Sequence, residues 1–401
     1  MNRHFKKTLM ASAALLGLAV ASNAMAQEDI KVGVILGFTG PIESLTPDMA
    51  ASAELAMKEA SDSGLLLGGA TVTPIRADST CIDAAAATAG AERLITSDNV
   101  VAIVGADCSG VTTAIAESVA IPNGVVMVSP SATSPALTTI TDNGYFFRTA
   151  PSDARGGEVL AQIVMDHGIT NVAVTYTNND YGKGLADSFS AAFVNLGGTV
   201  AATAAHEDGK ADYSAEVAAL AASGADHLAV FGYVDQGGKG IIQTSLDTGA
   251  FQGFILGDGM IGQSLIDNLG DGINGTIGNV PGSDSEGSKT FDVLARDGGI
   301  EGDGPYRAES YDAGALIMLA IQAGGSADRA SIQANIMNVA NAPGEPIGPG
   351  ELAKALQILA DGGDVDYVGA TNVELTEVGE TTGSYKELII EDGAFKTLSI
   401  R

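Results

Sequence analysis

Two loops decide the predicted fold: Gly105-Ala-Asp-Cys-Ser-Gly-Val-Thr-Thr113 and Ser129-Pro-Ser-Ala-Thr-Ser-Pro135. Each follows a short apolar run typical of a buried strand, at 100–104 and at 125–128, and the first also opens a helical pattern over 110–120. Glycine and small hydroxyl residues between a strand end and a helix start bring free backbone N–H groups and the positive end of the helix dipole into one crevice. In open α/β sheets, ligands bind in such crevices where the strand order reverses. The two loops are therefore predicted to hold a small molecule that carries a carboxylate.

Three hydroxyl residues of these loops, Ser109, Ser131 and Thr133, are the first candidates for contact with that molecule. Residues of this kind also serve as helix caps and turn formers. The spacing alone leaves both roles open.

The first 26 residues have the pattern of a secretory signal peptide: a basic start, an apolar run over 9–20, and an Ala-x-Ala site that predicts cleavage after Ala26. The apolar run is short for a membrane span, and no later segment reaches the roughly 18 apolar residues that spanning requires. The residue directly after the cleavage site is not a cysteine, which argues against a lipid anchor at the mature N-terminus. We expect an exported, periplasmic protein.

The charge balance restricts the partners. Removal of the three basic leader residues takes the formal net charge from −29 to −32, and such an acidic surface disfavours nucleic acid and anionic membrane as partners. Charged residues are only 17% of the chain and apolar residues 45%, as in a globular protein. A mature length near 375 residues indicates two domains.

Cys81 and Cys108 are the only cysteines. In an oxidising compartment they are expected to form one disulfide, directly before Ser109. A catalytic Cys–His pair is the alternative, but oxidised sulfur is not a nucleophile and no histidine lies nearby in the sequence.

Strand and helix patterns alternate in two successive series, which predicts an α/β protein with two doubly wound parallel-sheet lobes and a cleft between them. The predicted strands are 31–38, 71–76, 100–104 and 125–128, then 171–177, 199–205, 227–231 and 253–256; the predicted helices are 48–61, 84–95, 110–120, 154–165, 182–195, 213–222 and 240–246.

The C-terminal part differs, with helical patterns at 307–322, 328–338 and 351–359 and no clear strand among them, then short strands over 368–401 with a hairpin at Glu391-Asp-Gly393. Helices without strands of their own must pack on a sheet formed by earlier strands, so the chain has to pass back to the first lobe. We therefore expect three crossings between the lobes, near 146–151, 280–283 and 365–371. The glycine-rich region after the second crossing is expected to be loose and exposed. The predicted N-terminal lobe is 27–147 plus 283–366, and the C-terminal lobe is 148–282 plus 367–401.

Several motifs occur in order along the chain: Thr39-Gly-Pro41, the cysteine pair followed by Ser109-Gly110, the loop 129–138, Phe147-Arg-Thr-Ala-Pro151, Asp180-Tyr-Gly-Lys-Gly184, Gly232-Tyr233 and Gly257-Asp-Gly259. In this set the sequence resembles the periplasmic leucine/isoleucine/valine-binding proteins of ABC importers. The resemblance implies a type I periplasmic binding protein fold with a three-segment hinge, closing on a free amino acid.

Residue by residue, the resemblance implies that Ser109 and Gly110 hold the ligand carboxylate. The backbone of Ser131, Ala132 and Thr133, with the Thr133 hydroxyl, would serve both the carboxylate and the ammonium. Tyr181 and Tyr233 would close over the ligand, and Asp258 would pair with its ammonium, where the family commonly has glutamate. By their own patterns, Tyr181 could instead cap a helix, Tyr233 could be core, and Asp258 could be a turn residue.

The stretch Ile42-Glu-Ser-Leu-Thr-Pro-Asp48 departs from the family, in which the corresponding loop usually contains glycine and an aromatic residue. It is one residue longer here. Leu45 and Ser44 are the candidates to face the ligand, and Leu45 would suit an aliphatic or aromatic side chain. Glu43 could select a polar ligand or lie exposed.

The predicted function is capture of a branched-chain or other hydrophobic amino acid for an inner-membrane ABC permease, by a monomer without cofactor or metal. The alternatives are a binding protein for another carboxylate or an amide, a sensory protein that docks on a membrane receptor, and an exported enzyme using Asp78, Asp107 or Asp258. The scattered histidines and the lack of HExxH, P-loop, GxSxG and CxxC motifs disfavour an enzyme.

Overall fold

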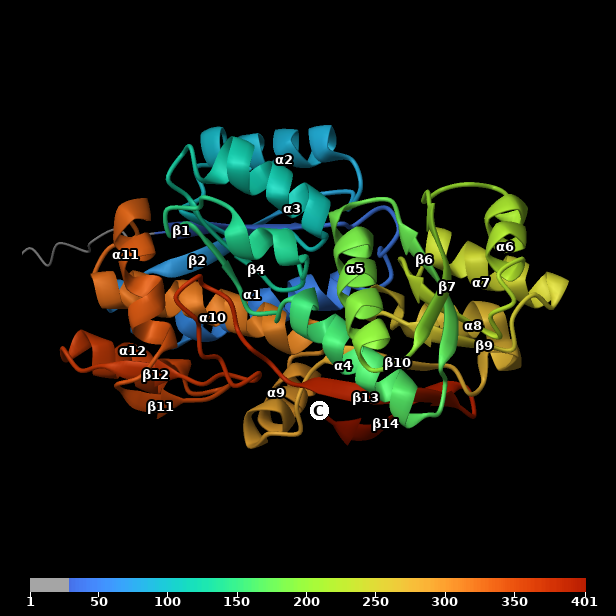
Figure 1. Cartoon of the computed structure of the whole chain (residues 1–401). Coiled ribbons are helices and arrows are strands. Elements are labelled where there is room, and N and C mark those ends of the chain that lie inside the picture. The colour runs from blue at the N-terminus through green and yellow to red at the C-terminus, as the bar shows by residue number, and fades with distance from the viewer. Residues whose placement is uncertain (1–28) are drawn as a thin grey trace, which may run out of the picture.

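Two large β-sheets form the frame of the protein in the computed structural model, which describes residues 29–401 (Figure 1). The signal peptide predicted for residues 1–26 lies outside the described residues. The first sheet has the strand order β2-β1-β3-β4-β5 and the second the order β14-β13-β10-β9-β8-β6-β7. The sheets and the helices packed on them are called the five-stranded lobe and the seven-stranded lobe below.

The five-stranded sheet is parallel throughout. Its strands are β1 (Asp29–Leu36), β2 (Thr71–Asp78), β3 (Ala102–Gly105), β4 (Val126–Ser129) and β5 (Phe146–Arg148). The helices of this part are α1 (Thr46–Asp62), α2 (Ala84–Thr96) and α3 (Ser109–Ile115), which continues as a π-helical turn, Ala116–Ala120. The strand order reverses between β1 and β3, so the loops after these two strands meet at the switch point.

The seven-stranded sheet repeats this design and adds a C-terminal hairpin. Its strands are β6 (Asn171–Thr177), β7 (Thr199–His206), β8 (His227–Phe231), β9 (Gly253–Leu256), β10 (Ile277–Pro281), β13 (Tyr385–Glu391) and β14 (Ala394–Ile400). Its helices are α4 (Asp153–Asp166), α5 (Asp180–Asn195), α6 (Ser214–Ala221), α7 (Gly237–Thr248) and α8 (Gln263–Leu269). Here the order reverses between β6 and β8.

The chain returns to the five-stranded lobe after β10, as the orange segment beside the blue α1 shows in Figure 1. This part contains α9 (Glu286–Asp297), α10 (Arg307–Gly324), α11 (Arg329–Ala340), β11 (Glu345–Ile347), α12 (Leu352–Ala360) and β12 (Val365–Tyr367). Helix α10 packs along α1 and is buried on nearly every face, which explains why its stretch 313–321 is apolar throughout.

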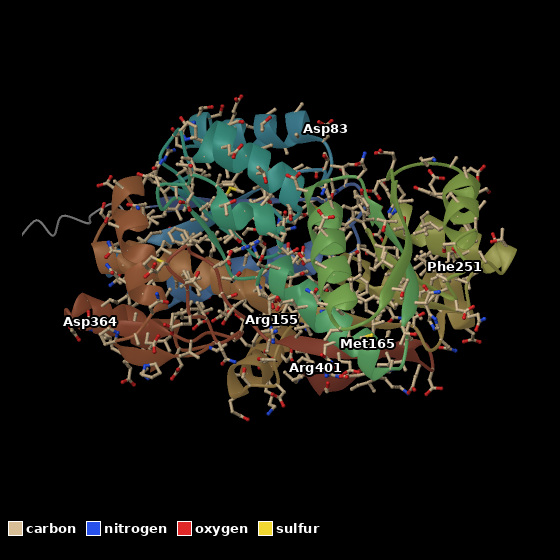
Figure 2. All side chains as sticks on the ribbon, viewed as in Figure 1. Asp83, Arg155, Met165, Phe251, Asp364 and Arg401 are labelled. Carbon is tan, nitrogen blue, oxygen red and sulfur yellow. A yellow bond between two sulfur atoms is a disulfide. The ribbon has the colours of Figure 1, made fainter. Side chains whose placement is uncertain are left out.

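The predicted hairpin is confirmed. Glu391 pairs with Ala394 across a two-residue turn, and both turn residues, Asp392 and Gly393, have positive φ, as a type I′ turn requires. Outside the core, charged side chains such as Asp83, Arg155, Asp364 and Arg401 project from the surface (Figure 2). No helix within residues 29–401 is both long enough and apolar enough to cross a membrane.

Two sequence expectations are wrong. The region after the second crossing is exposed over much of its length, as expected, but it is not loose. It folds into α9, capped by the Ser285 hydroxyl and anchored by Phe291 and Ala295. A side chain at Gly287 would have its Cβ 2.3 Å from the Gly369 carbonyl oxygen, so that glycine permits close packing. Strands also lie among the C-terminal helices, since β11 and β12 form a parallel pair, and β10 was not foreseen.

Candidate functional site

A small cavity lies between the two lobes, with a free volume of about 30 Å³. This is well below the roughly 300–1,000 Å³ of sites that hold a small molecule, so a ligand enters only when the lobes separate. Its lining comes from the loops at both switch points and from the start of α10. The lining residues are Ile42, Leu45, Met49, Asp107, Cys108, Ser109, Ser131, Tyr181, Tyr233, Asp258, Gly259 and Tyr306. Six of the nine residues predicted from sequence are thus brought together; Gly110, Ala132 and Thr133 are outside this lining.

Asp107 fixes the floor of the cavity. Its carboxylate accepts hydrogen bonds from the backbone N–H of Gly37, the Ser79 hydroxyl (2.9 Å) and the N–H of Cys108 (2.9 Å), and so joins the ends of three strands. Burial raises the pKa of Asp107, and the three donors act in the opposite direction. Because its oxygens already accept these loop donors, Asp107 has a structural role in holding the loops.

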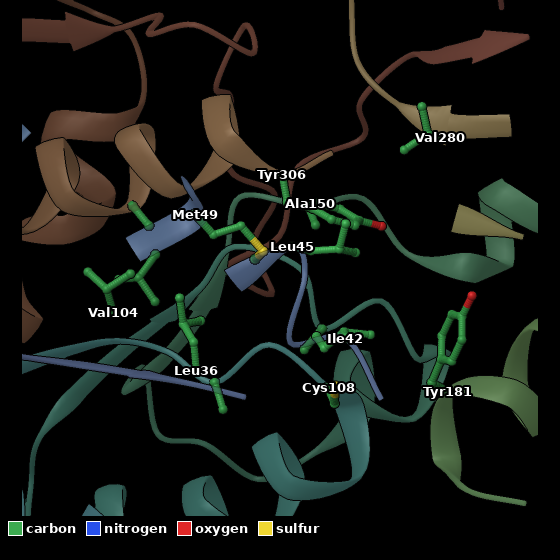
Figure 3. Close-up of a cluster of buried hydrophobic side chains, with 14 of the residues drawn as sticks. Leu36, Ile42, Leu45, Met49, Val104, Cys108, Ala150, Tyr181, Val280 and Tyr306 are labelled. Carbon is green, nitrogen blue, oxygen red and sulfur yellow. The ribbon is translucent and has the colours of Figure 1, made fainter. Parts of the chain in front are cut away.

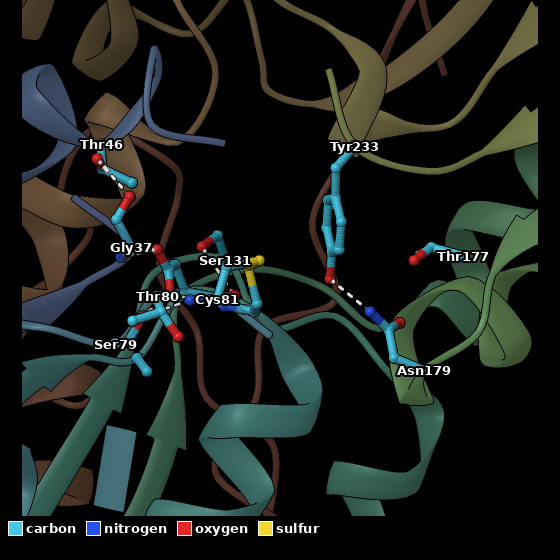
Figure 4. The surroundings of a disulfide bond; sticks show 12 residues. Gly37, Thr46, Ser79, Thr80, Cys81, Ser131, Thr177, Asn179 and Tyr233 are labelled. Atoms are coloured by element: carbon cyan, nitrogen blue, oxygen red, sulfur yellow. Dashed lines mark hydrogen bonds between the residues drawn. A yellow bond between two sulfur atoms is a disulfide. The ribbon is translucent and has the colours of Figure 1, made fainter. Parts of the chain in front are cut away.

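The predicted disulfide between Cys81 and Cys108 is present. It ties the loop after β2 to the residue that precedes α3. Figure 4 shows Ser131 beside this disulfide and Tyr233 opposite, in the seven-stranded lobe, with its hydroxyl bonded to Asn179. The covalent bond therefore stiffens the wall on which Ser109 and Ser131 lie.

The two serines have free hydrogen-bonding capacity toward the cavity. Ser109 Oγ accepts the N–H of Ser134 (3.1 Å), which leaves its hydroxyl hydrogen free to donate, and Ser131 Oγ donates to the Asp107 carbonyl (3.2 Å) and can still accept. The backbone of Ala132, which was expected to contact the ligand, is already used within the loop. Its N–H is donated to Ser129 Oγ (3.0 Å) and its carbonyl accepts from Arg148 (3.0 Å), so both backbone groups serve the loop itself.

Gly110 lies in the first turn of α3, and a Cβ there would meet no atom within 4 Å. Open space at this position leaves the backbone of the turn accessible. The helix start thus offers N–H groups beside Ser109, as the sequence predicts, although Gly110 itself is outside the cavity lining.

Asp258, 6% exposed, is the carboxylate at the centre of the site. It accepts hydrogen bonds from Tyr181 (2.9 Å) in its own lobe and from Tyr306 in the other. Burial raises the pKa of Asp258, although both tyrosine hydroxyls oppose that shift. Tyr306 therefore links the lobes through the residue predicted to recognise an ammonium.

A second buried carboxylate, Asp153, stands close to Asp258. Burial raises the pKa of Asp153 well above its usual value, and the charge of Asp258 raises it further. The neighbouring Thr133 hydroxyl and the charge of Arg148 act in the opposite direction. Asp153 Oδ2 and the Thr133 hydroxyl are both buried, and neither makes a hydrogen bond of good geometry within residues 29–401. The site thus holds two buried acids and a hydroxyl with spare hydrogen-bonding capacity, an arrangement that a cationic donor would satisfy.

Tyr181 and Tyr233 stack with ring centroids 5.2 Å apart and planes inclined by 20°. Both are nearly fully buried, and burial raises the pKa of each phenol well above its usual value. The pair forms an aromatic wall of the cavity on the seven-stranded lobe, and Figure 4 shows Tyr233 across from Ser131.

Apolar side chains line the other side of the cavity. Ile42 and Leu45 point inward from the loop after β1, beside Met49 of α1 (Figure 3). Leu45 lies where the sequence predicts, but Ser44 does not line the cavity and instead contacts the opposite lobe. Glu43 is exposed, the commoner of its two expected outcomes.

Four residues of this site were not predicted from the sequence. Ile42, Met49 and Tyr306 line the cavity, and Asp153 lies close to Asp258. Tyr306 follows a glycine-rich stretch and precedes α10, so its pattern is that of a loop. Asp153 follows the crossing motif Phe147-Arg-Thr-Ala-Pro151, and its place at a helix start resembles ordinary capping. Within residues 29–401, no cluster of three or more His, Cys, Asp or Glu side chains could hold a metal ion.

Comparisons with known proteins fit this geometry. The sequence profile of a family described as periplasmic binding protein matches residues 29–356. Leu/Ile/Val-binding protein homolog 1 of Brucella abortus (strain 2308) is 30% identical over 329 residues, which cover 80% of this chain and 86% of that protein.

Two solved structures share the fold at lower identity. The leucine-binding protein LivK of Thermotoga maritima superposes with a TM-score of 0.78 at 24% identity, covering 92% of this chain and 98% of that one. LivJ of Streptococcus pneumoniae in complex with isoleucine gives a TM-score of 0.77 at 21% identity, covering 93% and 99%. These likenesses confirm the expected fold of two doubly wound lobes. The family profile covers most of this chain, and the alignment with the Brucella relative covers most of both proteins. The chain therefore belongs to the periplasmic binding protein family.

Proposed function

We propose that this protein is the substrate-binding component of an ABC importer and captures a free amino acid with an aliphatic side chain. The observation that carries the proposal is the group of buried acceptors at the lobe interface: Asp258 and Asp153, with the Thr133 hydroxyl beside Asp153 and no cationic side chain among the residues that line the cavity. An ammonium supplies three donors and one positive charge, which satisfies these groups together.

The ligand carboxylate would lie at the other end of the cavity. Ser109 has a free hydroxyl hydrogen, and the first turn of α3 presents backbone N–H groups and the positive end of the helix dipole. Charge-assisted hydrogen bonds of this type contribute about 1.5–3 kcal/mol each. The acceptors and the donors at opposite ends fix the orientation of an α-amino acid.

The side chain of the ligand would contact Ile42, Leu45 and Met49. All three are apolar, and none offers a hydrogen bond to a polar side chain. The branched aliphatic amino acids combine the required charges and apolar surface, and the Leu/Ile/Val-binding relatives and the isoleucine-bound LivJ support the same class.

Export and delivery complete the proposed role. The signal-peptide pattern of residues 1–26, with cleavage after Ala26, accords with a family of periplasmic proteins. The mature protein would act as a monomer, close its lobes on the ligand and present the closed form to an inner-membrane ABC permease, which would perform the transport.

A thermal-shift screen of the mature protein tests this function. The panel contains L-leucine, L-isoleucine, L-valine, L-glutamate, leucinamide, 4-methylpentanoate and 4-hydroxybenzoate. A ligand at 100 times its Kd stabilises the native state by about 2.7 kcal/mol, so a branched-chain amino acid is expected to raise the Tm most. A larger rise with 4-methylpentanoate or 4-hydroxybenzoate than with L-leucine would assign the site to carboxylic acids instead.

A further inference from the structure

The loop 41–45 is held by the opposite lobe at a point outside the ligand cavity. Asp235, just beyond β8, accepts the backbone N–H of Ser44 on Oδ2 (2.9 Å), and its own N–H is donated to the Pro41 carbonyl (3.0 Å). Ser264 of α8 donates its hydroxyl to Asp235 Oδ1 (2.8 Å) and lies 3.2 Å from the Ser44 hydroxyl oxygen. These four bonds form a group that we call the Asp235 latch.

The latch is placed to control the site without touching a ligand. Asp235 and Ser264 do not line the cavity, whereas Ile42 and Leu45, within the latched loop, do. On the other side, Asp235 follows the cavity residue Tyr233 by two positions. The latch therefore joins a cavity-lining segment of one lobe to a cavity-lining segment of the other.

The sequence of the loop makes such an external support necessary. The stretch 42–48 has no glycine that would define a tight turn. Two backbone bonds form within this loop, from the N–H of Leu45 to the Ile42 carbonyl (3.0 Å) and from the N–H of Glu43 to the Gly40 carbonyl (3.4 Å). A loop with few internal bonds loses conformational entropy when it is ordered, and an outside anchor lowers that cost at the moment of binding.

We propose that Asp235 is a positioning residue that holds the 41–45 loop in place and raises the closed fraction of the protein before any ligand enters. The apparent affinity of a site that binds only in the closed form scales with the closed fraction. Loss of the latch therefore weakens all ligands by the same factor, whereas a change in the cavity wall, such as Leu45→Ala, changes the preference among ligands. The effect on affinity rests on the proposed function; the effect on closure does not.

The first test needs no ligand. Amide hydrogen exchange at Ser44 is measured by NMR in the ligand-free mature protein and in its Asp235→Ala variant. The Ser44 amide is expected to exchange severalfold faster in the variant, because its acceptor is gone. Equal exchange rates in the two proteins would overturn the latch, whatever the protein binds.

The second test uses L-leucine and L-valine as probes in stopped-flow and calorimetric titrations. Asp235→Ala is expected to weaken both by about tenfold through faster dissociation, and Asp235→Asn, which keeps one acceptor oxygen, to fall between it and the wild type. Asp267→Ala is the matched control, since Asp267 is an exposed acid of α8 whose carboxylate, in the described part of the chain, accepts a hydrogen bond only from Gln263 of the same helix.

Two outcomes would contradict a positioning role. One is a loss of affinity in Asp235→Ala no larger than in Asp267→Ala. The other is a loss for L-leucine that differs more than threefold from the loss for L-valine, which would make Asp235 part of the selective wall. If neither probe binds the wild-type protein, the proposed function fails, and the exchange measurement still decides whether the latch exists.

Discussion

Replacement of Asp258 by asparagine separates recognition of an ammonium from recognition of the rest of the ligand. Asparagine has nearly the same shape and keeps one acceptor oxygen, but it carries no charge. In the structure, Asp258 is buried and hydrogen-bonded by Tyr181 and Tyr306, so the substitution alters the charge of the site with little change in its volume.

The magnitude follows from the loss of one charge-assisted hydrogen bond in a site with little access to water. Such a bond contributes about 1.5–3 kcal/mol, which corresponds to a roughly 10- to 150-fold weaker Kd for L-leucine. For 4-methylpentanoate, which has the same carbon skeleton without the amine, Asp258→Asn removes no favourable contact. Its Kd is expected to stay unchanged or to improve, because the buried acid pair of Asp258 and Asp153 is reduced to one acid.

Isothermal titration calorimetry of both ligands against both proteins measures this difference. Thermal unfolding of the ligand-free variant serves as the control for correct folding. An equal loss of affinity for L-leucine and for 4-methylpentanoate would refute the assignment of Asp258 to the ammonium.

Three further predictions concern single features of the structure. Thr133→Ala is expected to weaken L-leucine binding by about 1–3 kcal/mol in calorimetry, because it removes a buried hydroxyl beside Asp153 that is proposed to contact the ligand; an unchanged affinity would remove Thr133 from the site. Burial raises the pKa of Glu309 from 4.5 to about 7, so the folded state disfavours the charged form and the free energy of unfolding falls as pH rises from about 4.5 through 7. In the Glu309→Gln variant, the decrease in unfolding free energy between pH 5 and pH 8 is expected to be smaller by up to about 3 kcal/mol, as measured by urea unfolding. The same decrease in both proteins would contradict this role of Glu309. Replacement of Cys81 and Cys108 by serine removes a disulfide between residues 27 positions apart. The chain-entropy model predicts that the unfolding free energy then falls by about 3.5 kcal/mol, and an unchanged midpoint in urea unfolding would count against this.

Much of the fold could be predicted because local pattern and tertiary packing agree in the two βα series. Continuous apolar runs became central parallel strands, and the turn at Glu391-Asp-Gly393 formed the expected hairpin. The positions of the ligand-facing loops followed from one general rule, since both sheets reverse their strand order next to the cavity.

The missed elements depend on long-range contacts. Strand β10 contains Gly278, whose missing side chain allows close approach to the Leu256 carbonyl oxygen of β9, where a Cβ would lie 2.8 Å away. Helix α9 buries only Phe291 and Ala295 against the rest of the lobe. Its apolar stripe is narrow and its other faces are polar, so the segment has a low mean hydropathy although its pattern is amphipathic. Its glycine neighbours indicate flexibility when they are considered without the packing that surrounds them.

The candidate site could be predicted in part for the same reason. Ser109, Ser131, Tyr181, Tyr233 and Asp258 follow strands directly, so their positions depend on the local pattern. Residues that reach the cavity from the hinge segments depend on how the chain crosses between lobes, which no local pattern specifies.

Tyr306 and Asp153 are two such residues. Asp153 follows the first crossing and Tyr306 immediately precedes α10, and each comes close to Asp258 only in the folded protein. Ser44 was predicted as a residue that faces the ligand but does not line the cavity. It is adjacent to the cavity residue Leu45 in sequence, yet its backbone N–H is donated to Asp235 of the opposite lobe.

A crystal structure of the mature protein with bound L-leucine tests the central claim most directly. The account predicts the leucine ammonium within about 3 Å of an Asp258 oxygen, its carboxylate at Ser109 and the start of α3, and its side chain against Leu45 and Met49. A ligand bound outside this cavity, or one whose carboxylate lies at Ser109 while its ammonium makes no contact with Asp258 or Asp153, would contradict it.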